Sequence, residues 1–118
     1  MANSTYESQD TWKTIEQFLP SRLHLKDGQQ PIEEWWENRG HQIHLDRWRN
    51  TKASLRVIMH HGVGTNGHQM SMILGIPLFK AGFEVVAIDM PGYGCTKVNK
   101  TGGPHSYKDW VDIADDFY

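Results

Sequence analysis

Two glycine-containing stretches hold the residues best suited to chemistry. The first, His61-Gly62-Val63-Gly64, directly follows the apolar residues 55–60, and the second, Asp89-Met90-Pro91-Gly92-Tyr93-Gly94, directly follows residues 84–88. Glycines on both sides of Val63 let the main chain approach a substrate closely. Backbone N–H groups held in such a loop stabilise the negatively charged oxygen that forms when an ester is attacked. The first stretch therefore suits acyl-transfer chemistry.

These loops require strands before them and helices after them. Residues 55–60 and 84–88 are short and rich in β-branched residues, which is typical of strands covered on both faces. Pro77 interrupts the helix expected between them, and Gly82 is suited to end it. Its predicted apolar face comprises Met70, Ile73, Leu74, Leu78 and Ala81.

A last helix is expected to begin after Ser106, a good N-terminal cap. Its apolar face comprises Tyr107, Trp110, Val111, Ala114 and Phe117. The order strand, loop, helix, strand, loop, helix predicts parallel strands joined by crossover helices. The fold class is therefore α/β.

The first half of the chain gives weaker signals. Residues 1–7 are polar and expected to fray. Residues 8–19 predict an amphipathic helix that Pro20 ends, with an apolar face of Trp12, Ile15, Phe18 and Leu19. A short extended piece is expected at 22–25, and residues 33–40 remain open between helix and strand. Residues 41–49 predict a strand with Ile43 and Leu45 on one face, opposite His44 and Asp46.

Composition excludes several classes of protein. The chain has 118 residues, 12 Lys+Arg against 14 Asp+Glu, and 38% hydrophobic residues, which is too apolar for a disordered chain. A basic excess typical of nucleic-acid binding is absent, and so is an apolar run of about 20 residues that could span a bilayer. Cys95 is the only cysteine, so an intrachain disulfide is excluded. The first residues do not resemble a secretory signal, and a cytoplasmic location is expected.

Residues 55–118 resemble the first βαβα unit of the α/β-hydrolase superfamily, particularly lysophospholipase and monoacylglycerol-lipase-like esterases. Two motifs carry the resemblance. His61-Gly62-Val63-Gly64 is similar to the oxyanion loop of that family, and Asp89 to Thr96 is similar to its Asp-x-x-Gly-x-Gly-x-Ser turn, with Thr96 in place of Ser. The resemblance implies one partial domain over 1–118: an N-terminal segment and helix (1–20), antiparallel leading strands (21–54) and the βαβα unit (55–118).

The resemblance also implies a serine-type hydrolase acting on small-molecule carboxylic esters, without a cofactor. The backbone N–H of Val63 is then the oxyanion donor. His61, Gly62 and Gly64 complete the oxyanion loop, and Asp89, Gly92 and Gly94 form a structural turn. Dehalogenase and epoxide-hydrolase relatives tend to carry Pro where this chain has Gly64, which favours ester chemistry. Relatives use Ser, Cys or Asp as nucleophile.

The nucleophile itself is not found. In this family it lies on a Gly-x-Ser-x-Gly turn after the next strand, with the triad acid and histidine later still. None of the six serines has glycine at both the −2 and +2 positions. The chain is therefore expected to supply the oxyanion loop but to be inactive alone. The strand at 55–60 would also lack its next neighbour, leaving an open sheet edge that favours association.

Other interpretations remain open. Gly62-x-Gly64-x-x-Gly67 with Asp89 at the next strand end matches a dinucleotide-binding fingerprint, which would indicate a Rossmann-like oxidoreductase. A non-catalytic interaction module is the second alternative, since at least one of the adjacent Trp35 and Trp36 must face away from the core. The seven histidines lack the ligand spacing of a zinc site, so no metal is expected.

Overall fold

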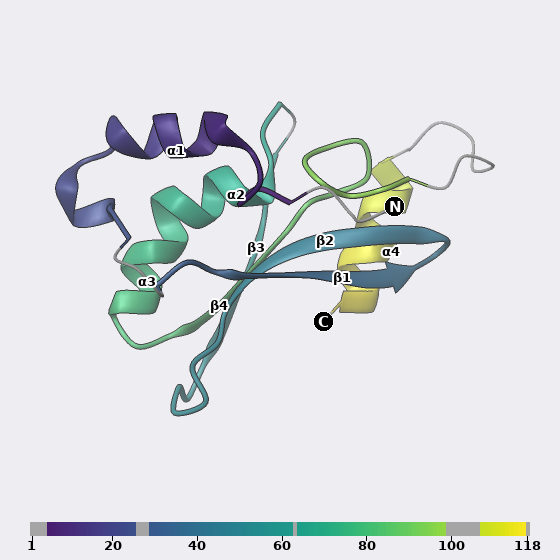
Figure 1. The fold of residues 1–118 in the computed structure, drawn as a ribbon. Coiled ribbons are helices and arrows are strands. Elements are labelled where there is room, and N and C mark those ends of the chain that lie inside the picture. The colour runs from purple at the N-terminus through teal and green to yellow at the C-terminus, as the bar shows by residue number, and fades with distance from the viewer. Residues whose placement is uncertain (1–4, 26–28, 63, 99–106, 118) are drawn as a thin grey trace.

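The computed structural model describes residues 5–25, 29–62, 64–98 and 107–117. These residues form a four-stranded mixed sheet with helices on both faces (Figure 1). In chain order the elements are α1 (Asp10–Gln17), the 3-10 helix η1 (Ser21–Leu23), β1 (Ile32–Asn38), β2 (His41–Trp48), β3 (Arg56–His60), α2 (Gly67–Met70), the π-helix η2 (Ser71–Gly75), α3 (Ile76–Lys80), β4 (Glu84–Ile88) and α4 (Tyr107–Phe117). All described helices are too short or too polar to pass through a membrane.

The strands lie in the order β1-β2-β4-β3. β1 and β2 form an antiparallel hairpin whose turn residues, Arg39 and Gly40, both have the positive φ that a tight hairpin turn requires (51° and 80°). β2 is antiparallel to β4, whereas β3 and β4 are parallel and are joined by the crossover through α2, η2 and α3. The predicted fold class, with antiparallel strands preceding a parallel βαβ unit, is confirmed. β1 resolves the open assignment of residues 33–40.

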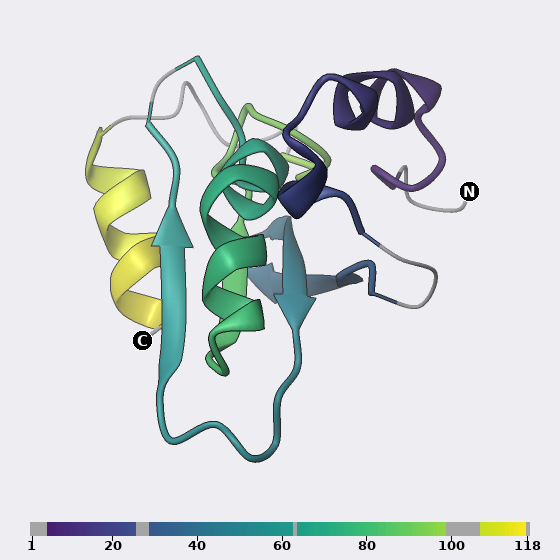
Figure 2. The ribbon, with the colours of Figure 1, turned by 90° about the vertical axis from the view of Figure 1, so that its left-hand side faces the viewer.

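Strand β4 is buried on both faces because its side chains alternate between two clusters. Val85 and Ala87 face α3 and η2, while Val86 and Ile88 face Ile113 of α4. Figure 2 shows α3 and α4 on opposite sides of the strands. The buried residues of the first cluster are Leu23, Trp48, Met59, Met72, Ile76, Val85 and Ala87. Those of the second are Ile43, Leu45, Val86, Ile88, Met90 and Ile113. The two clusters together hold the ends of β3 and β4 in place.

The predicted apolar face of the crossover helix is wrong in part, although Met70 and Leu78 do pack against the core. Ile73 and Leu74 are exposed, and Met72 and Ile76 fill the core instead. The cause is the π-helical segment η2, whose wider turn shifts every later side chain around the axis relative to a regular α-helix. Pro77 lies in the first turn of α3, where its missing N–H costs least, so the helix restarts there as predicted.

Four expectations for the first half of the chain also need correction. Tyr6 is only 3% exposed, so residues 5–7 of the stretch expected to fray are anchored in part. Phe18 of the predicted apolar helix face is 84% exposed. Residues 22–25 do not form a strand, because the carbonyl oxygen of Pro20 accepts the N–H of Leu23 and the chain enters η1 directly after Pro20. In β2, His44 and Asp46 are as buried as the apolar residues, since the segment around Tyr6 covers their face.

Candidate functional site

The loop after β3 and the turn after β4 lie at the same edge of the sheet. The two strands are parallel and in register, with His60 opposite Ile88, so the residues that follow them emerge together. His61 is buried and connects the two segments. Its Nε2 accepts the backbone N–H of Met90 at 2.9 Å, and its Nδ1 lies 2.9 Å from the carbonyl oxygen of Gly62.

These two contacts define the state of the His61 ring. Nε2 must carry a lone pair to accept the N–H of Met90, and Nδ1 must carry the proton to donate to Gly62. The imidazole is therefore neutral and in the Nδ1–H tautomer. Tyr93 and Trp110 pack edge-on against the ring, with centroids 5.3 and 5.5 Å away. The side chain holds the start of the glycine loop in one orientation.

Asp89, at the end of β4, is fully buried and organises the surrounding backbone. Its Oδ1 accepts the N–H of Gly67 at 2.6 Å. Its Oδ2 accepts the hydroxyl of Tyr6 at 2.6 Å and the N–H of Cys95 at 3.0 Å. This carboxylate therefore fixes the beginning of α2, the turn after β4 and the N-terminal segment relative to one another.

Two glycines are required by close approach in this region. A Cβ on Gly67 would lie 2.7 Å from the carbonyl oxygen of Ile88, so α2 can begin this close to β4 only without a side chain. Gly94 has a φ of +56°, and a Cβ there would collide with the Tyr6 hydroxyl and the Asp89 carboxylate.

The remaining predicted residues of the site are placed as follows. Gly62 and Gly64 lie within the loop after β3, and Gly92 lies in the turn after β4. Val63, the expected oxyanion donor, lies outside the described residues. Thr96, which stands where the family has Ser, donates its hydroxyl to the carbonyl of Asp89 at 2.6 Å and accepts the N–H of His44 at 2.9 Å. The hydroxyl therefore joins the turn after β4 to β2.

A buried charged network extends this arrangement into the sheet. The Nε2 of His44 lies 2.8 Å from Glu33 Oε1, and its Nδ1 lies 2.9 Å from Asp89 Oδ2. Burial by itself lowers the pKa of His44, but hydrogen bonding to the two carboxylates outweighs it and raises that pKa to about 9. Burial opposes ionisation of Asp89 and Glu33 as well, yet bonds from His44 and Tyr6 hold the pKa of both carboxyls below their usual range. The imidazole is positively charged at neutral pH.

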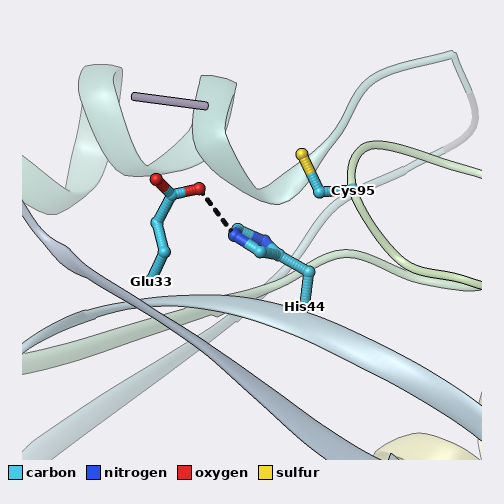
Figure 3. A group of neighbouring side chains, drawn as sticks. All are labelled: Glu33, His44 and Cys95. Carbon is cyan, nitrogen blue, oxygen red and sulfur yellow. Dashed lines mark hydrogen bonds and ion pairs between the residues drawn. The ribbon is translucent and has the colours of Figure 1, made fainter. Parts of the chain in front are cut away.

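The cluster of Glu33, His44 and Cys95 is the set of described residues closest to a metal-ligand arrangement (Figure 3). One ligand atom of each lies within 4.8 Å of the others. The chemistry of the donors does not suit a metal, because both nitrogens of His44 face carboxylates. Burial, with the charge of Asp89, raises the pKa of the Cys95 thiol to about 12, and a protonated thiol is a poor ligand. We therefore infer no metal centre from these three residues.

Sequence reasoning missed Tyr6, Glu33 and His44 as members of the site. Each reaches Asp89 or its partners from a distant part of the chain, and the pattern of β2 placed His44 on a different face from the core. The one available signal was Tyr6, a large aromatic residue inside an otherwise polar N-terminal stretch.

The structure bears on both alternative interpretations. Asp89 has no exposed surface and both of its oxygens accept hydrogen bonds, so it cannot bind a ribose hydroxyl as the dinucleotide hypothesis requires. Trp35 and Trp36 are both half-buried on opposite faces of the hairpin, where Trp35 contacts His44 and Trp36 contacts Phe117. These intramolecular contacts weaken the case for an interaction module built on the two rings.

Comparisons with known proteins agree with this geometry. Residues 56–118 match a family model described as the alpha/beta hydrolase fold. A thioesterase domain from the curacin biosynthetic pathway superposes with a TM-score of 0.62 at 26% identity, over 74% of this chain and 30% of its own. A hydrolase from Pseudomonas aeruginosa PA01 superposes with a TM-score of 0.56 at 16% identity, over 78% of this chain and 32% of its own length.

An enantioselective mutant of the epoxide hydrolase from Aspergillus niger gives a TM-score of 0.59 at 18% identity, over 99% of this chain and 36% of its own. This chain therefore spans about a third of the length of these structures. No curated protein sequence matches it significantly.

Proposed function

Because the chain belongs to the α/β-hydrolase fold family, we propose that it is the N-terminal part of a serine-type hydrolase of small carboxylic esters. In this proposal the loop from His61 to Gly64 supplies an oxyanion donor, the backbone N–H of Val63. One structural neighbour is a thioesterase domain, and a thioesterase cleaves an acyl group from sulfur. This likeness favours acyl transfer over other hydrolase chemistry.

The observation that carries the proposal is the pair of hydrogen bonds made by His61. The C=O of Gly62 and the N–H of residue 63 belong to one peptide group, and a trans peptide directs these two groups oppositely. The Gly62 carbonyl lies 2.9 Å from Nδ1 of the buried His61 ring, which fixes the carbonyl side of this peptide group. An oxyanion donor must face a substrate and not the protein interior, and a carbonyl held against a buried ring supports that role for the opposite side of the peptide group.

The proposal assigns the nucleophile to sequence other than residues 1–118, since no serine here has the Gly-x-Ser-x-Gly frame. The 118-residue chain should therefore not hydrolyse p-nitrophenyl butyrate above the buffer rate, and a fluorophosphonate probe should not label it. Labelling of any of its serines would contradict this assignment.

The donor role is tested in any longer form of the protein that does hydrolyse an ester. Val63→Pro removes the N–H, and we expect kcat to fall about 10²- to 10³-fold. Val63→Ala retains the N–H and serves as the matched control, with kcat close to that of the unchanged enzyme. Equal kcat for the two variants would overturn the oxyanion role.

The outer edge of β3 supports a further part of the proposal. β3 is the last strand in the order β1-β2-β4-β3, and Leu55 just before it is 63% exposed. An unpaired parallel strand presents N–H and C=O groups to another strand. We propose that this edge pairs with more polypeptide in the complete enzyme. We also propose that the complete enzyme is cytoplasmic. Sedimentation of the 118-residue chain should show concentration-dependent association, whereas a monomer at all concentrations would contradict pairing between chains.

A further inference from the structure

A cavity of about 330 Å³ lies beside α1, away from the candidate oxyanion loop. Its walls come from the N-terminal segment, α1, the beginning of β1, the end of β2 and the α2–η2 stretch; the lining residues that matter here are Tyr6, Trp12, Glu16, Glu33, Trp48 and His68. The volume is within the range of pockets that hold small molecules. Among the described residues, those lining it do not include the loop residues from His61 to Gly67 or the turn from Asp89 to Thr96.

The aromatic residues of the lining offer rings but few polar atoms. The Nε1 of Trp12 donates to the side chain of Gln9, and that of Trp48 donates to the carbonyl of Gln29. The hydroxyl of Tyr6 is bound by Asp89. The ring of His68 also lines the cavity, with Nδ1 2.6 Å from Asp46 Oδ2. Because the donors of Trp12, Trp48 and Tyr6 are already satisfied, these three rings contribute apolar and π surface to the cavity. Such surfaces attract cations as well as apolar groups.

The charges around the cavity also favour a cation. Glu16 lines the cavity and uses Oε1 to accept the N–H of Leu25. Glu7 adds a second carboxylate. Lys13 adds one positive charge to the lining, and Asp10 Oδ1 lies 3.8 Å from its Nζ atom in a solvent-exposed pair. The remaining wall carboxylate, Glu33, shares the positive charge of His44 with Asp89, so this buried group adds net negative charge to that of Glu7 and Glu16.

We propose that this cavity binds a small organic ammonium compound, with its charged group near Glu16 and its alkyl groups against Trp12 and Trp48. Carboxylates exclude organic anions, and rings without free donors give little to a neutral polar ligand. The ammonium group is the shared chemistry of a free amine and of a lipid headgroup. This inference does not depend on the proposed hydrolase activity.

The first test is a tryptophan-fluorescence titration of the full chain with choline chloride. We expect saturable quenching, and 3,3-dimethylbutan-1-ol, a neutral molecule of nearly the same shape, should bind about fivefold more weakly or not at all. Equal binding of the two compounds, or no binding of choline, would overturn the proposal. Phosphatidylcholine vesicles form a separate arm. Co-sedimentation that choline competes away would identify a headgroup, whereas choline binding without co-sedimentation would identify a free ammonium compound.

The second test uses Glu16→Gln, which removes the charge but keeps an oxygen that can accept from Leu25. Choline affinity should fall about fivefold or more, because the side chain loses its attraction for the cation. Glu37→Gln is the matched control, since Glu37 is exposed on β1 and does not line the cavity. Trp12→Leu should also weaken choline binding while the neutral alcohol is little affected. Unchanged choline affinity in Glu16→Gln would overturn the assignment of the charged group.

Discussion

The hydroxyl of Tyr6 donates a 2.6 Å hydrogen bond to Asp89 Oδ2, across 83 positions of sequence. The same Tyr6 donates its backbone N–H to Glu33 Oε1 at 2.6 Å, and its ring stacks on His68 with centroids 4.3 Å apart. The N-terminal segment is therefore part of the structure that holds the turn after β4. The phenol stays protonated, because burial and the negative charge of Asp89 both raise the pKa of Tyr6.

Tyr6→Phe should destabilise the fold by about 1–3 kcal/mol, because it leaves a buried carboxylate with one donor fewer. Urea unfolding followed by circular dichroism measures this difference. Tyr93→Phe is the matched control, since Tyr93 is half-buried on the adjacent turn and keeps its ring contacts with His61 and Trp110. A Tyr6→Phe variant as stable as Tyr93→Phe would show that the Tyr6–Asp89 bond contributes nothing.

His44 makes stability depend on pH in the alkaline range. Its pKa in the folded protein is raised to about 9, above the ordinary value of 6.5. A group with a raised folded-state pKa contributes its full stabilisation below pH 6.5 and loses it as the pH rises through about 9. The shift corresponds to about 3 kcal/mol. The free energy of unfolding should therefore decline between pH 6.5 and 9.

His44→Gln should remove most of that decline and lower stability at pH 6. His24→Gln is the control, because His24 is exposed on the surface and its Nε2 lies 2.8 Å from the carbonyl oxygen of Leu19. Asp89 and Glu33 make stability depend on pH in the acidic range, in the opposite direction. Their pKa values in the folded protein are lowered, so the stabilisation that they contribute is lost as the pH falls through these lowered pKa values. A free energy of unfolding that stays constant from pH 6.5 to 9 in the unchanged protein would contradict a charged His44.

The parts of this structure that sequence reasoning predicted well depend on local pattern. The two buried parallel strands and the crossover between them follow from short apolar runs separated by glycine, and β3 and β4 match the predicted ranges within one residue. The helix predicted over 8–19 is observed as α1 over Asp10–Gln17, and its end before Pro20 follows from the missing N–H of proline.

The parts that could not be predicted depend on partners that are distant in sequence. Residues 33–40 contain Glu and Trp in a pattern that fits either element, and only pairing with β2 makes them a strand. The faces of the crossover helix depend on the π-helical segment, where Gly75 lies against the ring of Trp48. Tyr6 and His44 contact Asp89, and Glu33 contacts His44, although all of them are distant from Asp89 in sequence. Long-range contacts therefore decide most of the polar site, whereas local pattern decides its scaffold.

Gly67 tests how closely α2 must approach β4. Gly67→Ala would place a methyl group 2.7 Å from the carbonyl oxygen of Ile88, and the resulting shift should cost about 1–3 kcal/mol of stability. Gly62→Ala is the matched control, because a Cβ there meets no heavy atom within 4 Å. Thermal melts of the two variants should differ clearly, with Gly62→Ala close to the unchanged protein. Equal melting temperatures would show that α2 can move away from β4 freely.

Cys95 should be chemically inert in the folded protein. It is 8% exposed, and burial beside Asp89 raises the pKa of its thiol to about 12, so the reactive thiolate is scarce at pH 8. We expect its reaction with DTNB to be about 100-fold slower in the folded chain than in urea. A Cys95→Ser/Ser54→Cys double variant provides an exposed thiol for comparison, since Ser54 is exposed between β2 and β3. Reaction of folded Cys95 at the rate of that exposed thiol would show that the turn after β4 opens readily and that Asp89 does not hold it closed.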